Sequence, residues 1–438
     1  MKSKWHTVRL GDVCQVNPDK RDSSWPHSVI SYIDIASVGN GVLNEQPRTV
    51  LVAEAPGRAQ RLVRAGDTIV STVRPNRRSF LYVSEPASTT VVSTGFAVLR
   101  AEEGFDPRFL YYLVTDQSFT DYLVAHEEGS AYPAVNSSVL GDAKVAIPDL
   151  PEQRAIAHIL GALDDKIELN RRMNETLESM ARALFKSWFI DFDPVHVKAE
   201  GRDPGLPADI AALFPDSFED SEFGEIPKGW RVTSLQDVLA ECETGSRPAG
   251  GVSKYPAGVP SVGAESIVGL GAFDYSKTKY VPRSFFDSMT KGHVRSRDVL
   301  LYKDGGRPGE FEPHVTLFGD GFPFSEYGIN EHVYRMRVSD KLGQNLLYFW
   351  LSSDLVMEEM RIKGTGVAIP GLNSTQVKSL PMLIPTRGIA AAFDALAEPC
   401  IARLLAGCTE SRKLALLRDT LLPRLMSGQL ELASLGSV

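Results

Sequence analysis

The sequence predicts an α+β fold in which two similar modules are joined by a pair of long helices. Two observations carry this prediction: an internal repeat relates the two halves of the 438-residue chain, and a seven-residue apolar pattern follows each copy. A period of more than about 200 residues is too long for a solenoid, so it indicates a duplicated domain with its connector. Each half is long enough to bury its own core. Two related modules on one chain favour a ligand that is itself two-fold or bipartite.

The repeat is recognised from matching segments whose offset changes along the chain. The matches are residues 5–13 with 230–238 at an offset of 225, 63–67 with 294–298 at 231, and 129–138 with 366–375 at 237. Differences in loop length explain the drift, because they shift later segments without altering the frame. We therefore expect a pseudo-two-fold internal repeat in which both copies share one fold.

Both copies are expected to combine short strands with a helix. Residues 1–148 and 226–385 contain β-branched and apolar runs bounded by Gly, Pro and Asn, which is typical of strands. In the first copy, Asp106-Pro107 opens a helix as an N-cap followed by proline at the first helical position. The expected strands include 68–73, 90–94 and 298–302, and the expected helices are 106–125 and 342–362.

A long helix is expected after each copy, at 149–190 and within 386–438. Apolar residues recur there at two positions in every seven, and two such seams favour an intramolecular antiparallel coiled coil over an amphipathic helix lying on a domain. Polar residues interrupt both seams, and buried polar residues commonly fix the register of paired helices. The expected pairing residues are Leu160, Leu163, Ile167, Asn170, Asn174, Leu177 and Leu184 on the first helix, and Leu404, Leu414 and Leu421 on the second, which is polar at Gly407, Ser411 and Arg418.

Charge is distributed unevenly along the chain. Residues 191–225 hold ten acidic and two basic side chains, so this expected linker, ordered in part with a short helix, accounts for the whole net charge of −8. Two windows in corresponding parts of the copies are basic: 54–78 at +4 (six basic minus two acidic) and 277–307 at +5 (eight minus three). Phosphate binding depends on local positive charge, so each window is a candidate DNA-facing patch, the alternative being a solvated basic face.

Composition and motifs argue against several classes of protein. Hydrophobic residues make up 43% and charged residues 23% of the chain, as in ordinary soluble domains, and no apolar run is long enough to cross a membrane. The start of the sequence lacks a signal-peptide stretch, and the four cysteines form no CxxC pair, so we expect a cytoplasmic protein without a metal site. GxxxxGK(S/T), strand-linked GxGxxG and HExxH motifs do not occur, so we expect no catalytic residue and no bound cofactor in this chain.

Polar side chains that suit DNA follow a predicted strand in each copy. Arginine can pair with guanine and asparagine with adenine, while hydroxyl groups reach phosphates or bases. The donors differ between the copies, as they would if the modules read different sequences. Two further polar loops contain Asn136 and Asn373, for which a helix cap or self-bonded turn is the favoured alternative. The candidate DNA-binding residues are Ser71, Thr72, Arg74, Asn76, Arg77, Arg78 and Tyr132 in the first copy, and Lys303, Arg307, Lys363 and Thr365 in the second.

Four segments in a fixed order span nearly the whole chain. They are 5–13 with its copy at 230–238, 66–76, 147–156, and 191–195 continuing to 226–230. Together they resemble the specificity subunit of a Type I restriction-modification enzyme. Residues 148–153 (PDLPEQ) are similar to that family's entry into its central helix. The second copy has PTRG at 385–388 instead, so we expect its helix to begin or dock differently.

The resemblance implies a DNA-reading subunit without catalytic activity of its own. Residues 1–148 and 226–385 would be target recognition domains, each reading one half of an interrupted site in double-stranded DNA. The helices at 149–190 and 386–438 would set the spacing and dock two methyltransferase subunits, which bind S-adenosylmethionine. Motor-nuclease subunits that use ATP and Mg²⁺ would join through the methyltransferase. The alternatives are a reader in a Type IIB-like or other phage-defence system, and a scaffold that holds two protein partners.

Overall fold

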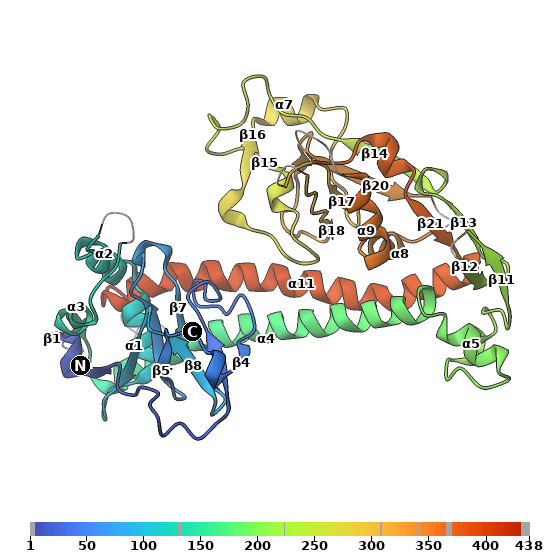
Figure 1. The fold of residues 1–438 in the computed structure, drawn as a ribbon. Helices are drawn as coiled ribbons and strands as arrows, with labels where there is room; N and C mark the ends of the chain where they lie inside the picture. The colour runs from blue at the N-terminus through green and yellow to red at the C-terminus, as the bar shows by residue number, and fades with distance from the viewer. Residues whose placement is uncertain are drawn as a thin grey trace. The chain divides into compact units, whose positions relative to one another are not determined.

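The computed structural model describes residues 5–129, 133–222, 224–306, 309–339, 342–364 and 370–430. Its contacts divide the chain into two compact units: unit 1 comprises Met1–Lys166 with Leu414–Val438, and unit 2 comprises Ile167–Lys413. Each unit holds one copy of the repeat, the first blue to cyan and the second yellow to orange in Figure 1, and a part of both long helices. The division falls inside the helices rather than at the expected module ends, because the helix ends contribute to the module cores.

Unit 1 is built on two four-stranded sheets and one two-stranded pair. Its strands are β1 (His6–Arg9), β2 (Cys14–Val16), β3 (Val29–Ile33), β4 (Arg48–Leu51), β5 (Ala59–Leu62), β6 (Thr68–Ser71), β7 (Phe80–Tyr82), β8 (Thr90–Ser93), β9 (Phe96–Ala101) and β10 (Lys144–Ile147). One sheet has the order β2-β9-β6-β7 and is antiparallel throughout. The other has the order β4-β3-β8-β5, in which β3 and β8 are parallel. β1 pairs with β10 and so joins the two ends of the module.

The helix expected at 106–125 is two helices, α1 (Pro107–Thr115) and α2 (Gln117–Ala125). Asp116 separates them because its backbone is extended (φ −63°, ψ 148°) and its carboxylate accepts a hydrogen bond from Ser118 N at 2.9 Å. Asp106 caps α1 in the same way, and proline follows it at the first helical position. A third helix, α3 (Ser137–Asp142), precedes β10.

The core of unit 1 includes both long helices, α4 (Leu150–Phe189) and α11 (Arg387–Met426). Ile156 and Leu160 near the start of α4, and Leu425 near the end of α11, pack in one buried cluster with Phe109 and Leu110 of α1. Each such side chain contributes about 2 kcal/mol when fully buried. The helix ends are therefore part of the first module and not a connector outside it.

Unit 2 repeats this plan. Its strands are β11 (Phe218–Ser221), β12 (Gly224–Pro227), β13 (Arg231–Ser234), β14 (Leu239–Thr244), β15 (Val259–Val262), β16 (Lys279–Val281), β17 (Val299–Tyr302), β18 (Val315–Leu317), β19 (Gly328–Ile329), β20 (Val333–Val338) and β21 (Pro381–Ile384). Its shorter helices are α5 (Asp193–Ala199), α6 (Ala208–Ala211), α7 (Arg283–Ser288), α8 (Gln344–Leu351), α9 (Asp354–Lys363) and α10 (Ser374–Lys378). Short 3-10 helices are η1 (Leu10–Asp12), η2 (Val52–Glu54) and η3 (Pro75–Arg77) in unit 1, and η4 (Leu235–Asp237), η5 (Ala264–Ser266) and η6 (Tyr275–Lys277) in unit 2.

The sheets of the two units correspond strand by strand. The order β14-β20-β17-β18 is the counterpart of β2-β9-β6-β7, and β16-β15-β19 is the counterpart of β4-β3-β8. The parallel pair recurs as β15 with β19. In the closing pairs, His6 faces Ile147 and Arg231 faces Ile384, which reproduces the sequence offsets of 225 and 237. The internal repeat found in the sequence is therefore present in the backbone pairing of both units.

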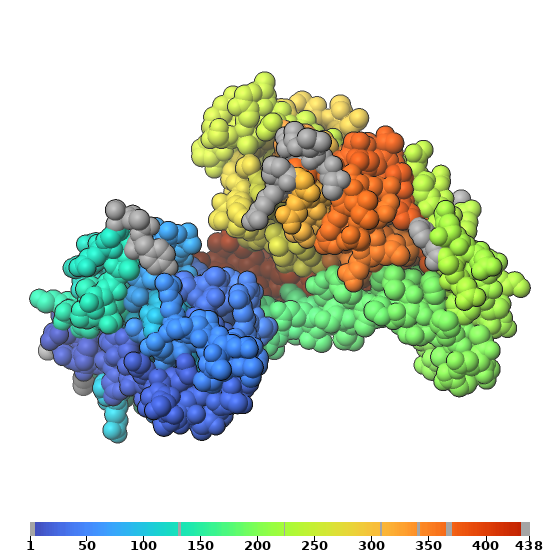
Figure 2. Space-filling view, in the orientation of Figure 1, coloured from blue at the N-terminus to red at the C-terminus, as the bar shows by residue number. Residues whose placement is uncertain are grey.

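The acidic segment 191–222 is more ordered than expected of a linker. It forms α5, α6 and the first strand of the β11–β12 hairpin. Val195 and Phe214 are buried in the core of unit 2, and the Phe214 ring lies 4.9 Å from the ring of Trp188 near the end of α4. Figure 2 shows this segment as a yellow-green surface beside the end of α4. Its apolar residues anchor it to the helix while its carboxylates face outwards.

Candidate functional site

In unit 1, the loop after the central strand β6 is fixed against the segment that precedes α3. Arg74 and Arg78 flank η3, and both have a left-handed backbone (φ 49° and 54°), which non-glycine residues seldom adopt. Val135 N donates to Thr72 O at 2.8 Å, and Arg74 N donates to Pro133 O at 2.9 Å. These hydrogen bonds hold the strained loop in one conformation.

The corresponding loop of unit 2 follows β17 and is held in the same way. Leu372 N donates to Lys303 O at 2.7 Å, and Gly305 N donates to Pro370 O at 2.9 Å. Each of these residues lies 231 or 237 positions after its counterpart in unit 1. The two copies therefore present the same frame of paired loops with different side chains on it.

Two candidate DNA-binding residues of the first loop are buried, which corrects the expectation that their hydroxyl groups face DNA. Ser71 and Thr72 are only 2% and 7% exposed. Ser71 Oγ donates to Val73 O at 2.7 Å, and Thr72 Oγ1 donates to Gly95 O at 2.9 Å. Because β6 is buried along its whole length, its last residue and the one after it point into the module and shape the loop from within.

Arg78 is also engaged inside the module, contrary to expectation. Its guanidinium donates to Gln117 Oε1 and to Thr115 O, each at 2.7 Å, and lies 5.4 Å from the centre of the Phe80 ring. These contacts fasten the loop to the junction of α1 and α2. The remaining candidates of this loop are Arg74, which is partly buried, and Asn76 and Arg77, which are exposed.

In the second copy, the two described lysine candidates lie next to acceptor groups. Lys303 Nζ donates to Glu331 O at 3.4 Å and lies 3.9 Å from the Asp304 carboxylate, while Lys363 lies 3.0 Å from the carboxylate of Glu359. Both lysines are partly exposed. Three further candidates lie outside the described residues: Tyr132, Arg307 and Thr365.

Acidic residues pair with most of the described basic side chains of the second basic window, which reduces its positive charge. Its ion pairs are Lys277 with Asp274, Lys279 with Glu265, Arg283 with Glu326, Arg295 with Glu241, and Arg297 with Asp320 and Glu398. Most of these acids come from distant parts of the chain, so a count along the window misses them. Among the described residues of the two loops, Arg77 of the first copy is exposed, whereas Lys303 of the second is partly buried beside Asp304.

A buried carboxylate near the start of each central strand was missed by the sequence analysis. Asp67 and Asp298 are 1% and 0% exposed. Arg100 donates to both oxygens of Asp67, at 2.8 and 2.7 Å, and Arg337 Nε donates to Asp298 Oδ1 at 2.8 Å. The hydrogen bond that Arg100 donates to Asp67 raises the pKa of Arg100 above its ordinary value. A signal was present, because the aspartates recur at the offset of 231 and the arginines at 237.

Asn136 and Asn373 cap short helices. Asn136 Oδ1 accepts from Ser138 N at 3.2 Å at the start of α3, and Asn373 Oδ1 accepts from Gln376 N at 2.9 Å at the start of α10. Capping satisfies backbone donors that have no partner within the helix, which explains why both asparagines recur. The two asparagines therefore recur because each caps a helix.

The two long helices contact each other through a polar layer in unit 2. Asn170 is fully buried, and its Nδ2 donates to Glu410 Oε2 at 2.9 Å. One turn later, Asn174 Nδ2 lies 3.2 Å from Cys408 Sγ. Partner numbers fall along α11 as they rise along α4, so the helices run in opposite directions here. A Cβ atom at Gly407 would lie 2.7 Å from Asn174 Oδ1, so a larger residue there would displace the Asn174 amide.

All ten predicted seam residues are buried or partly buried. In unit 1, Arg418 Nη1 of α11 donates to Asp164 Oδ1 of α4 at 2.8 Å. Leu160, Asn170 and Leu404 are buried, and Leu163, Ile167, Asn174, Leu177, Leu184, Leu414 and Leu421 are partly buried. The pairing of the two helices along the whole heptad pattern stays a prediction.

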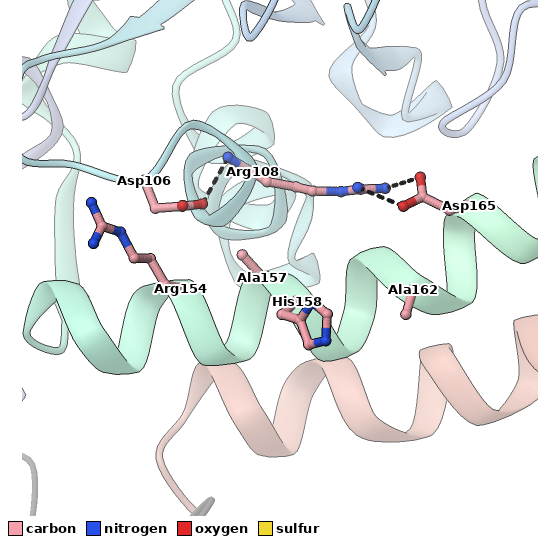
Figure 3. Close-up of a pocket in the computed structure, with 7 residues that line it drawn as sticks. All are labelled: Asp106, Arg108, Arg154, Ala157, His158, Ala162 and Asp165. Carbon is pink, nitrogen blue, oxygen red and sulfur yellow. Dashed lines mark hydrogen bonds and ion pairs between the residues drawn. The ribbon is translucent and has the colours of Figure 1, made fainter.

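A pocket of about 300 Å³ lies between the start of α1 and the outer face of α4 (Figure 3). Arg108 spans it and donates to both carboxylate oxygens of Asp165, at 2.9 and 2.6 Å. Arg154 and His158 line the same pocket from α4. The Arg108 pair attaches the first module to the long helix.

Metal-binding and membrane-spanning features were sought across the described part of the chain. The described residues contain no group of three or more His, Cys, Asp or Glu side chains arranged to hold a metal ion. Within the same ranges, no helix is both long and apolar enough to span a bilayer.

Comparison with known proteins shows which family the chain resembles. A model of the Type I restriction modification DNA specificity domain matches residues 2–179. The Type I restriction enzyme HindI specificity subunit of Haemophilus influenzae is 25% identical to this chain over 98% of the chain and 100% of its own length. Along nearly its whole length, the chain is therefore similar to the specificity subunits of Type I restriction-modification enzymes. The MjaIX specificity subunit of Methanocaldococcus jannaschii is also 25% identical, over 81% of this chain and 76% of its own.

The fold of this chain is shared with a solved structure. The Type-I restriction-modification system S subunit from M. genitalium has a TM-score of 0.55 to this chain at 13% identity, and 97% and 96% of the two chains are covered. The family model ends at residue 179, inside α4, so it covers the first copy and most of the first helix. The second copy is recognised through its correspondence with the first.

Proposed function

We propose that this specificity subunit recognises an interrupted DNA site by placing one recognition domain on each half. The observation that carries the proposal is the shared frame of paired loops, held by the matching hydrogen bonds of Val135 and Leu372. On this frame, Arg77 is exposed in the first copy, whereas the second presents Lys303 beside Asp304. Base edges are read by side-chain donors and acceptors, so a constant frame with different side chains suits two different half-sites.

We also propose that α4 and α11 form an antiparallel coiled coil that sets the gap between the half-sites. Each helix has 40 residues, which corresponds to about 60 Å at about 1.5 Å per residue. Asn170 is buried at the seam, and a buried polar residue favours one register because other registers leave it without partners. A single register of the two helices gives a single distance between the half-sites.

The catalytic activities are proposed to lie in partner subunits. Exposed apolar side chains on the long helices suit a protein interface and are candidates for docking two methyltransferase subunits. They are Leu169, Met180, Leu396, Leu416 and Leu417, which are 43–57% exposed. In this proposal S-adenosylmethionine binds to the methyltransferases, ATP and Mg²⁺ bind to motor-nuclease subunits, and this chain has no catalytic role. The complex would act in the cytoplasm, where its DNA is.

A domain exchange tests the proposal. Residues 1–148 are replaced by the corresponding domain of another family member, and the methylated sites are read by methylome sequencing of cells that also express the methyltransferase. We expect one half-site to change and the other to stay the same. Simultaneous change of both half-sites would contradict modular reading. A mobility shift on random duplex DNA, with and without the methyltransferase, separates this reader from a scaffold that binds only proteins.

A further inference from the structure

One arginine of the second copy is held by a carboxylate close to the paired loops. Arg247 follows β14, and its Nε lies 2.5 Å from Glu331 Oε1. The Arg247 side chain is 54% exposed, whereas that of Glu331 is 30% exposed. The carboxylate is thus the more fixed partner, and the guanidinium extends from it towards solvent.

Backbone hydrogen bonds connect this arginine to the loops of the proposed interface. Gly245 N donates to Asn330 O at 3.1 Å, and Lys303 N donates to His332 O at 2.9 Å. A Cβ atom at Gly245 would overlap the carbonyl oxygen of Ile329, so only glycine allows the chain to pass this closely. The segment that carries Arg247 and the loop after β17 therefore lie on either side of residues 330–332.

A chain of side-chain contacts runs from the loop to the arginine. His332 Nδ1 donates to Asp304 Oδ1 at 2.6 Å. His332 Nε2 on the other side of the ring lies 3.5 Å from Glu331 Oε1, the same oxygen that Arg247 contacts. Asp304 is itself fixed, because it forms a backbone bridge with Gly371. Arg247 is therefore positioned by a continuous set of groups that begins in the paired loops.

We propose that Arg247 reads a guanine in the half-site of the second recognition domain, with Glu331, His332 and Asp304 as positioning residues. The inference rests on the proposed DNA-reading function and assigns it a residue. A guanidinium is planar and has five N–H donors. Because Glu331 is nearest to Nε, the edge formed by Nη1 and Nη2 remains available for the O6 and N7 acceptors of guanine in the major groove.

A base edge suits this arginine better than a phosphate does. The Glu331 carboxylate cancels much of its charge, and a phosphate contact depends on net charge and counterion release. The contact with guanine instead depends on the direction of two donors, which the carboxylate fixes. Of the nearby described cations, Lys303 lies next to Asp304 and Lys363 next to Glu359, so both of these charges are already partly neutralised.

The test uses the chain in complex with its methyltransferase subunits. Wild-type protein, Arg247→Lys and Glu331→Gln are compared by methylome sequencing and by competition binding on duplexes that vary each base pair of the site. Arg247→Lys keeps the positive charge but loses the two parallel N–H donors of the guanidinium. Lysine therefore cannot replace an arginine that reads guanine. The matched control is Arg202→Lys, because Arg202 is also an exposed, carboxylate-paired arginine of unit 2 but lies in the acidic segment. Thermal unfolding of each variant checks that it folds.

We expect Arg247→Lys to lose preference for guanine at one base pair of one half-site by about 5- to 150-fold. The other half-site and the salt dependence should stay unchanged, Glu331→Gln should show a smaller loss at the same base pair, and Arg202→Lys should behave as wild type. An unchanged preference, an equal loss on every sequence, or a second half-site of A·T pairs alone would overturn the assignment. If the proposed DNA-reading function is itself wrong, the result differs, because the wild-type complex would then show no sequence preference at all.

Discussion

Arg108 and Asn345 occupy corresponding positions in the two copies, 237 residues apart, and each donates to the long helix beside it. Arg108 donates to both carboxylate oxygens of Asp165 on α4, and Asn345 Nδ2 donates to Glu398 on α11 at 2.8 Å. One is an ion pair and the other a charged hydrogen bond. The duplicated frame is thus attached to its helix at the same point by different side chains.

Loss of the Arg108 attachment is expected to destabilise unit 1. Arg108→Ala removes the bidentate pair with Asp165 and the contact of the guanidinium with the Tyr82 ring, whose centre is 5.6 Å away. Because Asp165 is largely exposed, solvent screening limits the loss of unfolding free energy to about 1 kcal/mol. Urea unfolding measures it. Arg9→Ala, which breaks an ion pair with Asp142 that is exposed on both sides, should cost less, and equal losses would argue against the attachment.

Asp394 is expected to make stability depend on pH. Burial, reinforced by the charge of Glu398, raises the pKa of Asp394 from 3.8 to about 6. The folded state therefore binds the proton more tightly than the unfolded chain, so this stabilisation is fully present below about pH 4 and is lost as the pH rises through about 6. Asp394→Asn should raise unfolding free energy at pH 7.5 by about 2 kcal/mol and reduce the difference between pH 5 and pH 7.5. Identical pH profiles in urea unfolding would show that the carboxylate is not perturbed, and Asp419→Asn is the exposed control.

Two neighbouring arginines of the first loop are expected to have separable roles. Arg77 is exposed, so Arg77→Ala should weaken DNA binding to a similar extent on all sequences and reduce the salt slope by about one. Arg78 is bonded to Thr115 and Gln117, so Arg78→Ala should lower thermal stability instead. Binding isotherms at several salt concentrations, together with melting curves, distinguish the two. Identical behaviour of the two variants would refute this division.

The length of the paired helices is expected to set the DNA spacer. Insertion of seven residues into both helices, after Asn174 and before Gly407, adds one heptad and keeps the seam in phase. The added length is about 10 Å, or about three base pairs of duplex. Methylome sequencing should therefore report a spacer longer by about three base pairs with unchanged half-sites. The same seven residues inserted at Gly205, in the acidic segment, should leave the spacer as it was, and an unchanged spacer in both variants would exclude the helices as the determinant.

The buried asparagine is expected to restrict the register of these helices. Asn170→Leu replaces a buried amide with an apolar side chain of similar size, so stability should be unchanged or higher. Without the amide that Glu410 holds, neighbouring registers become closer in free energy. The methylated sites should then include more than one spacer length. A single spacer identical to that of the wild type would show that the apolar seam alone fixes the register.

Repetition made much of the fold predictable from the sequence. The drifting offsets anticipated which segments of the two copies correspond, because residues that keep their spacing across a duplication belong to the same frame. Once His6 pairs with Ile147 in the first copy, the offsets lead to the pairing of Arg231 with Ile384 in the second. The helix breaks at Asp116 and Ser352 were not anticipated, since apolar periodicity continues across them while local capping ends each helix.

The candidate interface was less predictable, because exposure is set by tertiary packing. Ser71 and Thr72 have the right donors at the end of a strand, but that strand is covered on both faces. Arg78 is two residues from an exposed asparagine and still turns inwards to Thr115. No sequence pattern pointed to Arg247 as a candidate, because its partner Glu331 is 84 residues away in the chain. Contacts of this kind emerge only when distant strands are brought together.

Leu425 is buried in the same cluster as Leu160, although one lies near the end of the chain and the other follows the first module. A ribosome releases the first module long before it makes α11, so that module must wait for the rest of the chain to complete its core. The domain synthesised first is therefore finished last. A chain that stops before residue 414 lacks Leu425, so the buried cluster that contains Leu160 stays incomplete until the last helix has been made.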